Sequence, residues 1–230
     1  MKTNKKTITL IIILLLILVV IFKLYNNHEP IKVAVLDTGI DKNEIKSKVV
    51  SKNFTLDDSN NYNHGTKNAK IIEKNNNVII YDAKVLNKHG IGNVEDTVKA
   101  IDWAICNEVN IINMSYGFKK DYTLLQKKIK EAHKKGIIII AANGNNIFGG
   151  KEYPAMYNET IAVGVLTKNN SKSIFNSNDD ADVYISISKK KNMVNNTSEA
   201  TATATYKLAE KFNKNLDTKN KKDIINLIKE

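Results

Sequence analysis

Three side chains that together can activate a nucleophile stand at three distant places in this chain. Asp37 follows a short apolar run, His64 precedes a glycine, and Ser198 precedes an alanine-rich stretch. A carboxylate can orient an imidazole, the imidazole can remove the proton of a hydroxyl, and the hydroxyl oxygen can then attack an electrophile. Taken singly, these residues also suit a turn, a loop and a helix N-cap. Their combination predicts a site of nucleophilic catalysis.

Strands alternate with helices after residue 30, and this order predicts an α/β fold: a doubly wound, mostly parallel sheet with helices on both faces. The apolar runs predict strands at 31–36, 78–85, 109–114, 137–142 and 160–165. Helical spacing predicts helices at 69–73, 94–107, 122–135 and 198–212, with an amphipathic helix in 213–230 that packs on the domain. In such sheets the functional site lies beyond the carboxyl ends of the strands. Asp37, His64 and Ser198 are expected at this edge.

The N-terminal segment has the pattern of a membrane-targeting element. Residues 1–6 carry three lysines, and residues 7–22 carry no charge. No small-x-small cleavage site follows, so we expect an uncleaved signal anchor, a transmembrane helix over 7–25, with the basic tip 1–6 in the cytoplasm. The domain of residues 30–230 would then lie outside the cell membrane, or be secreted if the segment were cleaved.

Composition excludes several other classes of protein. The net charge of +11 arises from 35 basic residues, all of them lysine, whereas readers of nucleic acid usually employ the planar arginine fork. We therefore expect no nucleic-acid partner. Cys106 is the sole cysteine, which excludes an intramolecular disulfide and a zinc site built from cysteines.

Several stretches in the same order resemble the subtilisin-like serine proteases, the subtilase family. VAVLDTGID at 33–41 resembles the family's Asp motif, NHGTKNAKII at 63–72 its His motif, and NNTSEATATATYKLAEKF at 195–212 its nucleophile helix. The stretches 81–117, 137–146 and 153–166 resemble the blocks between them. The similarity covers about 32–212 and implies a three-layer subtilisin-like peptidase domain.

The resemblance implies a role for each matching residue. Ser198 would attack the scissile carbonyl, His64 would carry the proton, and Asp37 would orient the imidazole. Asn145 would donate to the oxyanion together with the Ser198 backbone N–H; Asn143 is the competitor, and Gly144-Asn145 is the better match to the motif. The peptide or protein substrate would lie as an added strand between two segments, Gly90-Ile91-Gly92 and Ser115-Tyr116-Gly117.

The match implies no cofactor. A structural calcium ion is known in the family, but the sequence lacks an evident ligand set, since its candidates are loop carboxylates. These candidates are Asp57, Asp58, Asp179 and Asp180.

The chain also departs from the family at positions close to the predicted site. The departures are Asn68 and Lys70 near the histidine, and Asn196, Glu199 and Thr201 near the serine. The first interpretation is a membrane-anchored, extracytoplasmic serine endopeptidase that acts through an acyl-enzyme, with the processing of secreted peptides as a candidate role. The alternative is a catalytically weak or inactive domain that binds peptides at the cell surface.

Overall fold

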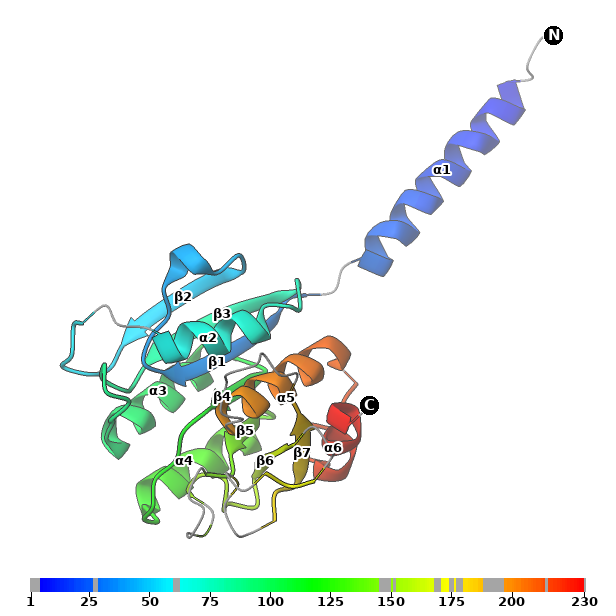
Figure 1. Ribbon diagram of the computed structural model, residues 1–230. Helices are drawn as coiled ribbons and strands as arrows, with labels where there is room; N and C mark the ends of the chain where they lie inside the picture. Colours follow the sequence, from blue (N-terminus) through cyan, green and yellow to red (C-terminus); the bar gives the residue numbers. More distant parts are fainter. Residues whose placement is uncertain are drawn as a thin grey trace. The chain divides into compact units, whose positions relative to one another are not determined.

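A parallel sheet of seven strands organises the residues after Pro30 in the computed structural model (Figure 1). The structure describes residues 5–26, 29–59, 63–144, 150, 152–167, 171–173, 176, 180–187, 197–213 and 215–229. The strands, in the order β2-β3-β1-β4-β5-β6-β7, are β1 (Ile31–Asp37), β2 (Lys48–Asn53), β3 (Val78–Lys84), β4 (Ile111–Met114), β5 (Ile138–Ala142), β6 (Thr160–Leu166) and β7 (Val183–Ser186). Every paired neighbour among these strands runs parallel.

The central strands are buried on both faces, which explains their continuous apolar sequences. All five residues of β5 are buried, as are all four of β4 and the last five of β1. Isoleucine and valine dominate these runs because branched side chains pack well on a pleated surface. The runs at 31–36, 78–85, 109–114, 137–142 and 160–165 were expected to be strands, and each contains one.

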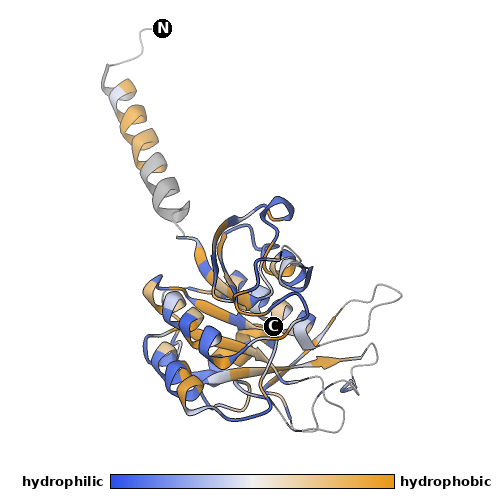
Figure 2. Cartoon of the chain, turned by 90° about the vertical axis from the view of Figure 1, so that its left-hand side faces the viewer, coloured by the Kyte–Doolittle hydropathy of each residue, from blue (hydrophilic) through white to orange (hydrophobic). Residues whose placement is uncertain are grey.

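Helices cover both faces of the sheet and divide the apolar interior into two clusters. The helices of this domain are α2 (Asn63–Ile72), α3 (Val94–Cys106), α4 (Thr123–Lys134), α5 (Thr197–Lys211) and α6 (Lys221–Lys229), with a short 3₁₀ turn η1 (Lys42–Glu44). Side chains of α2, α5 and α6 contribute to one cluster, and those of α3 and α4 to the other. Figure 2 shows the strands mainly in the hydrophobic colour, between helices on which hydrophobic and hydrophilic colours alternate. The expected doubly wound arrangement is confirmed.

Two strands, β2 and β7, were not expected from the sequence. Both lie at the edges of the sheet. No residue of β2 is fully buried, and β7 alternates between buried and more exposed side chains. An edge strand needs a less continuous apolar run than a central one, so the pattern that identifies β5 is absent from both.

The C-terminal tail forms α6 and packs on the domain, as expected. Ile224 and Ile228 are buried in the same cluster as α5. Lys207 and Lys211 of α5 donate through Nζ to the carbonyl oxygens of Ile228 and Leu227, at 3.0 and 3.1 Å. Lysines at the last carbonyls of a helix complement the negative end of its dipole.

The N-terminal unit, residues 1–30, contains one helix, α1 (Lys5–Asn26). Its aliphatic side chains between Ile8 and Leu18 are exposed. The part of the α1 ribbon that is coloured in Figure 2 is mostly in the hydrophobic colour. Within the described part of the chain, no helix meets the length and hydropathy required to cross a membrane. The transmembrane helix expected over 7–25 is therefore not supported.

Candidate functional site

Asp37 closes β1 at the carboxyl edge of the sheet, and its side chain is fully buried. The carboxylate accepts a hydrogen bond from the Thr38 backbone N–H at 2.7 Å. The Asp37 carbonyl oxygen accepts from the N–H groups of Val85 and Leu86, at 2.9 and 3.1 Å, so the end of β1 is held to the segment after β3. The buried carboxylate thus has a fixed position.

His64 is the second residue of α2 and lies directly against Asp37. Its Nδ1 is 2.7 Å from Asp37 Oδ1 and 2.9 Å from Oδ2. Burial opposes protonation of the imidazole, but the hydrogen bond to Asp37 and the charge of this carboxylate outweigh burial and raise the pKa of His64, while Lys67 opposes the rise. The adjacent Gly65 permits this approach, since a Cβ there would lie 2.3 Å from the Gly39 carbonyl oxygen.

Asn68 is a further partner of Asp37, from the next turn of α2. Its Nδ2 donates to Asp37 Oδ2 at 2.9 Å, and only 3% of the residue is exposed. The sequence marked Asn68 as a departure from the family pattern, but did not show where the side chain points. In the structure Asn68 is one of three donors to the Asp37 carboxylate, with Thr38 and His64.

Ser198 is the second residue of α5, and 5% of it is exposed. Its Oγ donates to the Ser115 carbonyl oxygen at 3.0 Å, and no hydrogen bond joins Ser198 to His64, although both residues are described. The first N–H groups of a helix have no partner within the helix, so the Ser198 backbone N–H lies where it can serve an anion.

A buried chain of hydrogen bonds ties the start of α5 to β4. Thr205 Oγ1 donates to Asn113 Oδ1 at 2.9 Å, Asn113 Nδ2 donates to Ser115 Oγ at 3.0 Å, and Ser115 Oγ donates to the Ser198 carbonyl oxygen at 3.3 Å. Asn113 is fully buried. This network, which the sequence did not indicate, holds the serine against the end of β4.

One cleft of about 1340 Å³ gathers most of the predicted site residues. His64, Gly90, Ser115, Tyr116, Gly117 and Ser198 line it. Asp37 lies behind His64, beneath the surface of the cleft. Asn145, the predicted oxyanion donor, lies outside the described residues, and its competitor Asn143 is fully buried.

Two predicted substrate residues, Ile91 and Gly92, are not part of the cleft wall. The Ile91 side chain is exposed. Gly92 forms an antiparallel bridge with Leu86, and a Cβ on Gly92 would lie 2.5 Å from the Val85 carbonyl oxygen. In the structure Gly92 therefore serves the close return of this loop onto the end of β3. Gly90 remains at the cleft.

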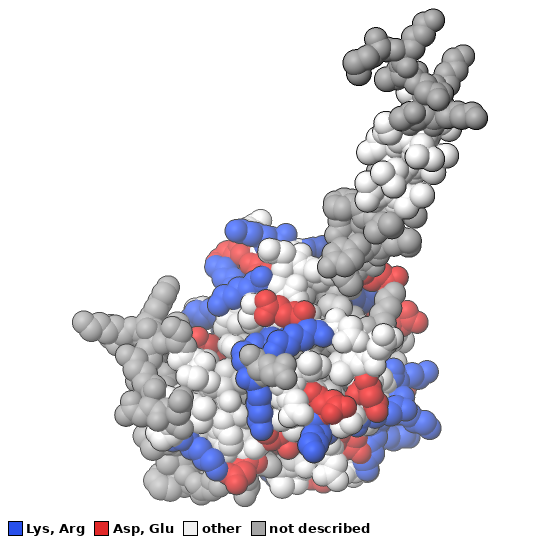
Figure 3. Space-filling view, turned by 90° about the vertical axis from the view of Figure 1, so that its right-hand side faces the viewer, with Lys and Arg blue, Asp and Glu red and all other residues white. Residues whose placement is uncertain are grey.

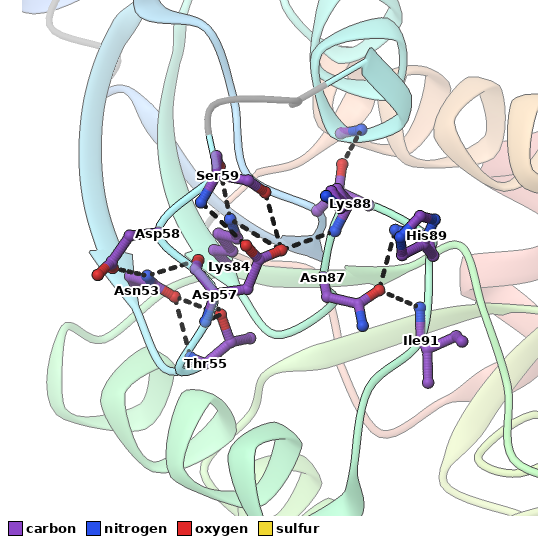
Figure 4. Close-up of polar contacts among 12 residues, drawn as sticks. Asn53, Thr55, Asp57, Asp58, Ser59, Lys84, Asn87, Lys88, His89 and Ile91 are labelled. Atoms are coloured by element: carbon purple, nitrogen blue, oxygen red, sulfur yellow. Dashed lines mark hydrogen bonds and ion pairs between the residues drawn. The ribbon is translucent and has the colours of Figure 1, made fainter.

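The loop after β2 supports this wall of the cleft, as Figure 4 shows. Asp57 accepts hydrogen bonds from the Lys88 backbone N–H at 2.8 Å, and from the N–H and Oγ of Ser59 at 2.9 and 2.8 Å. The Ser59 bonds, the Lys88 bond and the charge of Lys84 lower the pKa of Asp57. Lys84 Nζ also donates to the Ser59 carbonyl oxygen at 2.8 Å. Asp57 thereby joins the loop to the segment that contributes Lys88 and Gly90 to the cleft.

The loop carboxylates considered as calcium ligands have other roles where they are described. Asp57 serves the loop contacts above, Asp58 accepts from Asn53 Nδ2 at 3.3 Å, and Asp180 pairs with Lys172. Asp179 lies outside the described residues. Among the residues whose positions are given, no three His, Cys, Asp or Glu side chains gather as metal ligands would.

Comparisons with known proteins identify the family of this chain. The family model described as the subtilase family matches residues 29–228. The chain is 34% identical over 165 residues to subtilisin DY of Bacillus licheniformis, covering 64% of this chain and 60% of the relative. It is 35% identical over 166 residues to subtilisin E of Bacillus subtilis (strain 168), covering 64% and 44% of the two chains.

A third relative is the minor extracellular protease Epr of Bacillus subtilis (strain 168), 30% identical over 164 residues, which cover 65% of this chain and 25% of the relative. The matched stretches thus span less than two thirds of each of these relatives. The family match extends from before β1 into the last turn of α6, so its range includes Asp37, His64 and Ser198. The chain belongs to the subtilase family.

Proposed function

We propose that this chain is a serine endopeptidase that hydrolyses peptide bonds through an acyl-enzyme. The observation that carries the proposal is the Asp37–His64 pair, with Nδ1 2.7 Å from the buried carboxylate, in the wall of a cleft that also holds Ser198. A carboxylate that fixes Nδ1 leaves the other ring nitrogen, Nε2, free to accept a proton. Membership of the subtilase family supports the same assignment.

The reaction would begin when Ser198 Oγ leaves the Ser115 carbonyl and turns toward His64. Oγ forms a bond to the substrate carbonyl carbon while its proton passes to Nε2, and Asp37 stabilises the resulting imidazolium. The charge on the substrate oxygen would be stabilised by the Ser198 backbone N–H at the start of α5 and by Asn145. His64 then gives the proton to the leaving amine as the C–N bond breaks. Water next attacks the acyl carbonyl carbon while His64 takes its proton, and His64 returns a proton to Ser198 Oγ as the ester bond breaks and the acid product leaves.

A fluorophosphonate probe tests this proposal directly. We expect the full chain to be labelled at Ser198, with labelling and peptide hydrolysis both lost in Ser198→Ala and strongly reduced in His64→Ala. Ser171→Ala is a matched control, because Ser171 is exposed and does not line the cleft. A folded chain that the probe does not label at Ser198 would contradict the proposal.

A second candidate function is peptide binding without turnover. The observation in its favour is that Ser198 Oγ donates to Ser115 and not to His64. This alternative predicts peptide affinity that Ser198→Ala leaves unchanged, and no cleavage product after prolonged incubation with the unmodified chain.

The proposal includes an extracytoplasmic enzyme attached to the membrane through residues 7–25. Its support is the uncharged run of sixteen residues behind three lysines in the sequence. We expect the full chain to sediment with membranes after alkaline carbonate washing and to be degraded by protease added to intact cells. A variant lacking residues 7–25 should lose both properties, and a full chain that carbonate extracts would contradict the attachment.

Substrates other than peptides or proteins have little support. Lysines and acidic side chains are interspersed on the face shown in Figure 3, which offers no continuous cationic surface to a polyanion. Processing of secreted peptides is the role we propose for the enzyme, since we also propose that it lies outside the cytoplasm.

A further inference from the structure

An acidic side chain, Glu152, lies in the wall of the same cleft as His64 and Ser198. An antiparallel bridge fixes its place: the Phe118 N–H donates to the Tyr153 carbonyl oxygen at 2.7 Å, and the Tyr153 N–H donates to the Phe118 carbonyl oxygen at 2.8 Å. Glu152 and Gly117 are the residues that precede this bridge on its two strands. The carboxylate is therefore held beside the segment that begins at Ser115.

The Glu152 side chain occupies space that is open because Gly117 and Gly144 have no Cβ atom. A Cβ on Gly117 would lie 2.5 Å from Glu152 Cβ and 2.8 Å from Oε2. A Cβ on Gly144 would lie 3.4 Å from Glu152 Cγ. The glutamate side chain thus lies in a slot between two bare stretches of backbone, one after β4 and one after β5.

The Glu152 carboxylate has no hydrogen bond or ion pair with any residue that the structure describes. Burial raises the pKa of Glu152, and the charge of Lys119 opposes this rise. A half-buried carboxylate without a fixed partner is unfavourable, and a cation brought by a ligand would relieve that cost. A site of this kind suits a substrate side chain that carries positive charge.

The slot is also within reach of the reacting bond. Ser198 Oγ is 3.0 Å from the Ser115 carbonyl oxygen, and Gly117 is two residues further along. Two residues of extended backbone span about 7 Å. Lysine and arginine carry their charge at the end of a long apolar stem, so either can extend from a carbonyl beside Ser198 along this segment to Glu152.

We propose that Glu152 is a specificity determinant that selects lysine or arginine as the residue whose carbonyl Ser198 attacks. The inference rests on the proposed peptidase function and adds the substrate class. The five lysines that also line the cleft make the contrary prediction, a preference for acidic residues. They are Lys67, Lys70, Lys74, Lys88 and Lys119. Of these, Lys119 is the lysine whose charge lowers the pKa of Glu152.

The test compares peptides that differ at that one residue, with arginine, its neutral isostere citrulline, lysine, methionine or glutamate. For the full chain we expect kcat/KM for arginine to exceed that for citrulline about 10- to 100-fold, as for other hydrogen bonds between charged groups. In Glu152→Gln the ratio should fall to near one. Glu131→Gln, the same change on α4 outside the cleft, should keep the ratio of the unmodified chain.

Binding by Ser198→Ala separates this inference from the peptidase proposal. The variant should bind the arginine peptide more tightly than the citrulline peptide, and this difference should disappear in the double variant Ser198→Ala, Glu152→Gln. Failure of the fluorophosphonate to label the unmodified chain would overturn the peptidase proposal alone. Equal affinities of Ser198→Ala for both peptides, a preference for glutamate, or an unchanged ratio in Glu152→Gln would overturn the role of Glu152.

Discussion

Replacing Asn68 with leucine should shift the pH dependence of the reaction, because Asn68 acts on His64 through Asp37. Leucine has nearly the shape of asparagine but no N–H to donate. Without the 2.9 Å bond from Asn68, the Asp37 carboxylate keeps Thr38 and His64 as its donors among the described residues. More of its negative charge is then available to the imidazole, so the protonated form of His64 is favoured and its pKa rises further.

The size of the shift follows from the strength of the lost bond. A hydrogen bond to a charged group contributes about 1.5–3 kcal/mol, and one pKa unit corresponds to about 1.4 kcal/mol. Complete transfer to His64 would therefore raise its pKa by about one to two units. The His64 side chain is 40% exposed, so solvent screens part of this effect, and we expect about half a unit to one unit.

The assay is kcat/KM for one peptide as a function of pH. Protonated His64 cannot accept the serine proton, so activity falls as the pH decreases through its pKa. In Asn68→Leu this acidic limb should move to higher pH, with reduced activity on the acidic side and convergence with the unmodified chain at alkaline pH. Asn76→Leu, an exposed change after α2, should leave the profile in place. An acidic limb that stays in place or moves down in a folded Asn68→Leu would refute the reasoning.

Three further substitutions test other parts of the structure. Asn113→Leu should lower the free energy of unfolding by about 1–3 kcal/mol and reduce kcat, because it leaves a buried Ser115 hydroxyl without its donor; urea unfolding that matches the unmodified chain would contradict this. Asp57→Asn should raise KM severalfold with kcat little changed, because the Lys88 segment loses its charged acceptor; steady-state kinetics in which only kcat falls would argue against the loop's role. Burial raises the pKa of Asp82 from 3.8 to about 6, with a smaller contribution from the charge of Asp37 and against hydrogen bonds that lower it. The folded state therefore loses stability as the pH rises from 3.8 through about 6. Asp82→Asn should therefore increase the free energy of unfolding at pH 8 by up to about 3 kcal/mol, and the gain should vanish at pH 4; a gain that is equal at both values would show another cause.

The sequence predicts the central strands well because burial on both faces leaves a continuous apolar run, as in β5. It does not predict β2 or β7, since edge strands need no such run. Asp37 and His64 could be predicted because their types and flanking residues are distinctive. The shape of the loop that places Ile91 in solvent depends on pairing between Gly92 and Leu86, which local sequence does not encode.

The roles of Asn68 and Glu152 could not be predicted from the sequence for a different reason. Each residue type is visible in the sequence, but its role depends on a partner or a neighbour far along the chain. Asn68 meets Asp37 only because α2 returns over the end of β1, and Glu152 enters the slot only because Phe118 pairs with Tyr153. Tertiary contacts of this kind decide the direction of a side chain, which residue type alone leaves open.

In the resting protein the Ser198 hydroxyl donates to the Ser115 carbonyl, so in the proposed mechanism it must leave this bond before it can reach His64. Breaking such a bond costs about 0.5–1.5 kcal/mol, so small electrophiles that leave this carbonyl untouched would react up to about tenfold more slowly. A peptide whose own amide N–H donates to the Ser115 carbonyl would displace the hydroxyl and release it toward His64. The Ser198 hydroxyl would then be fully reactive only when an extended peptide is bound. Toward small electrophiles it would be less reactive.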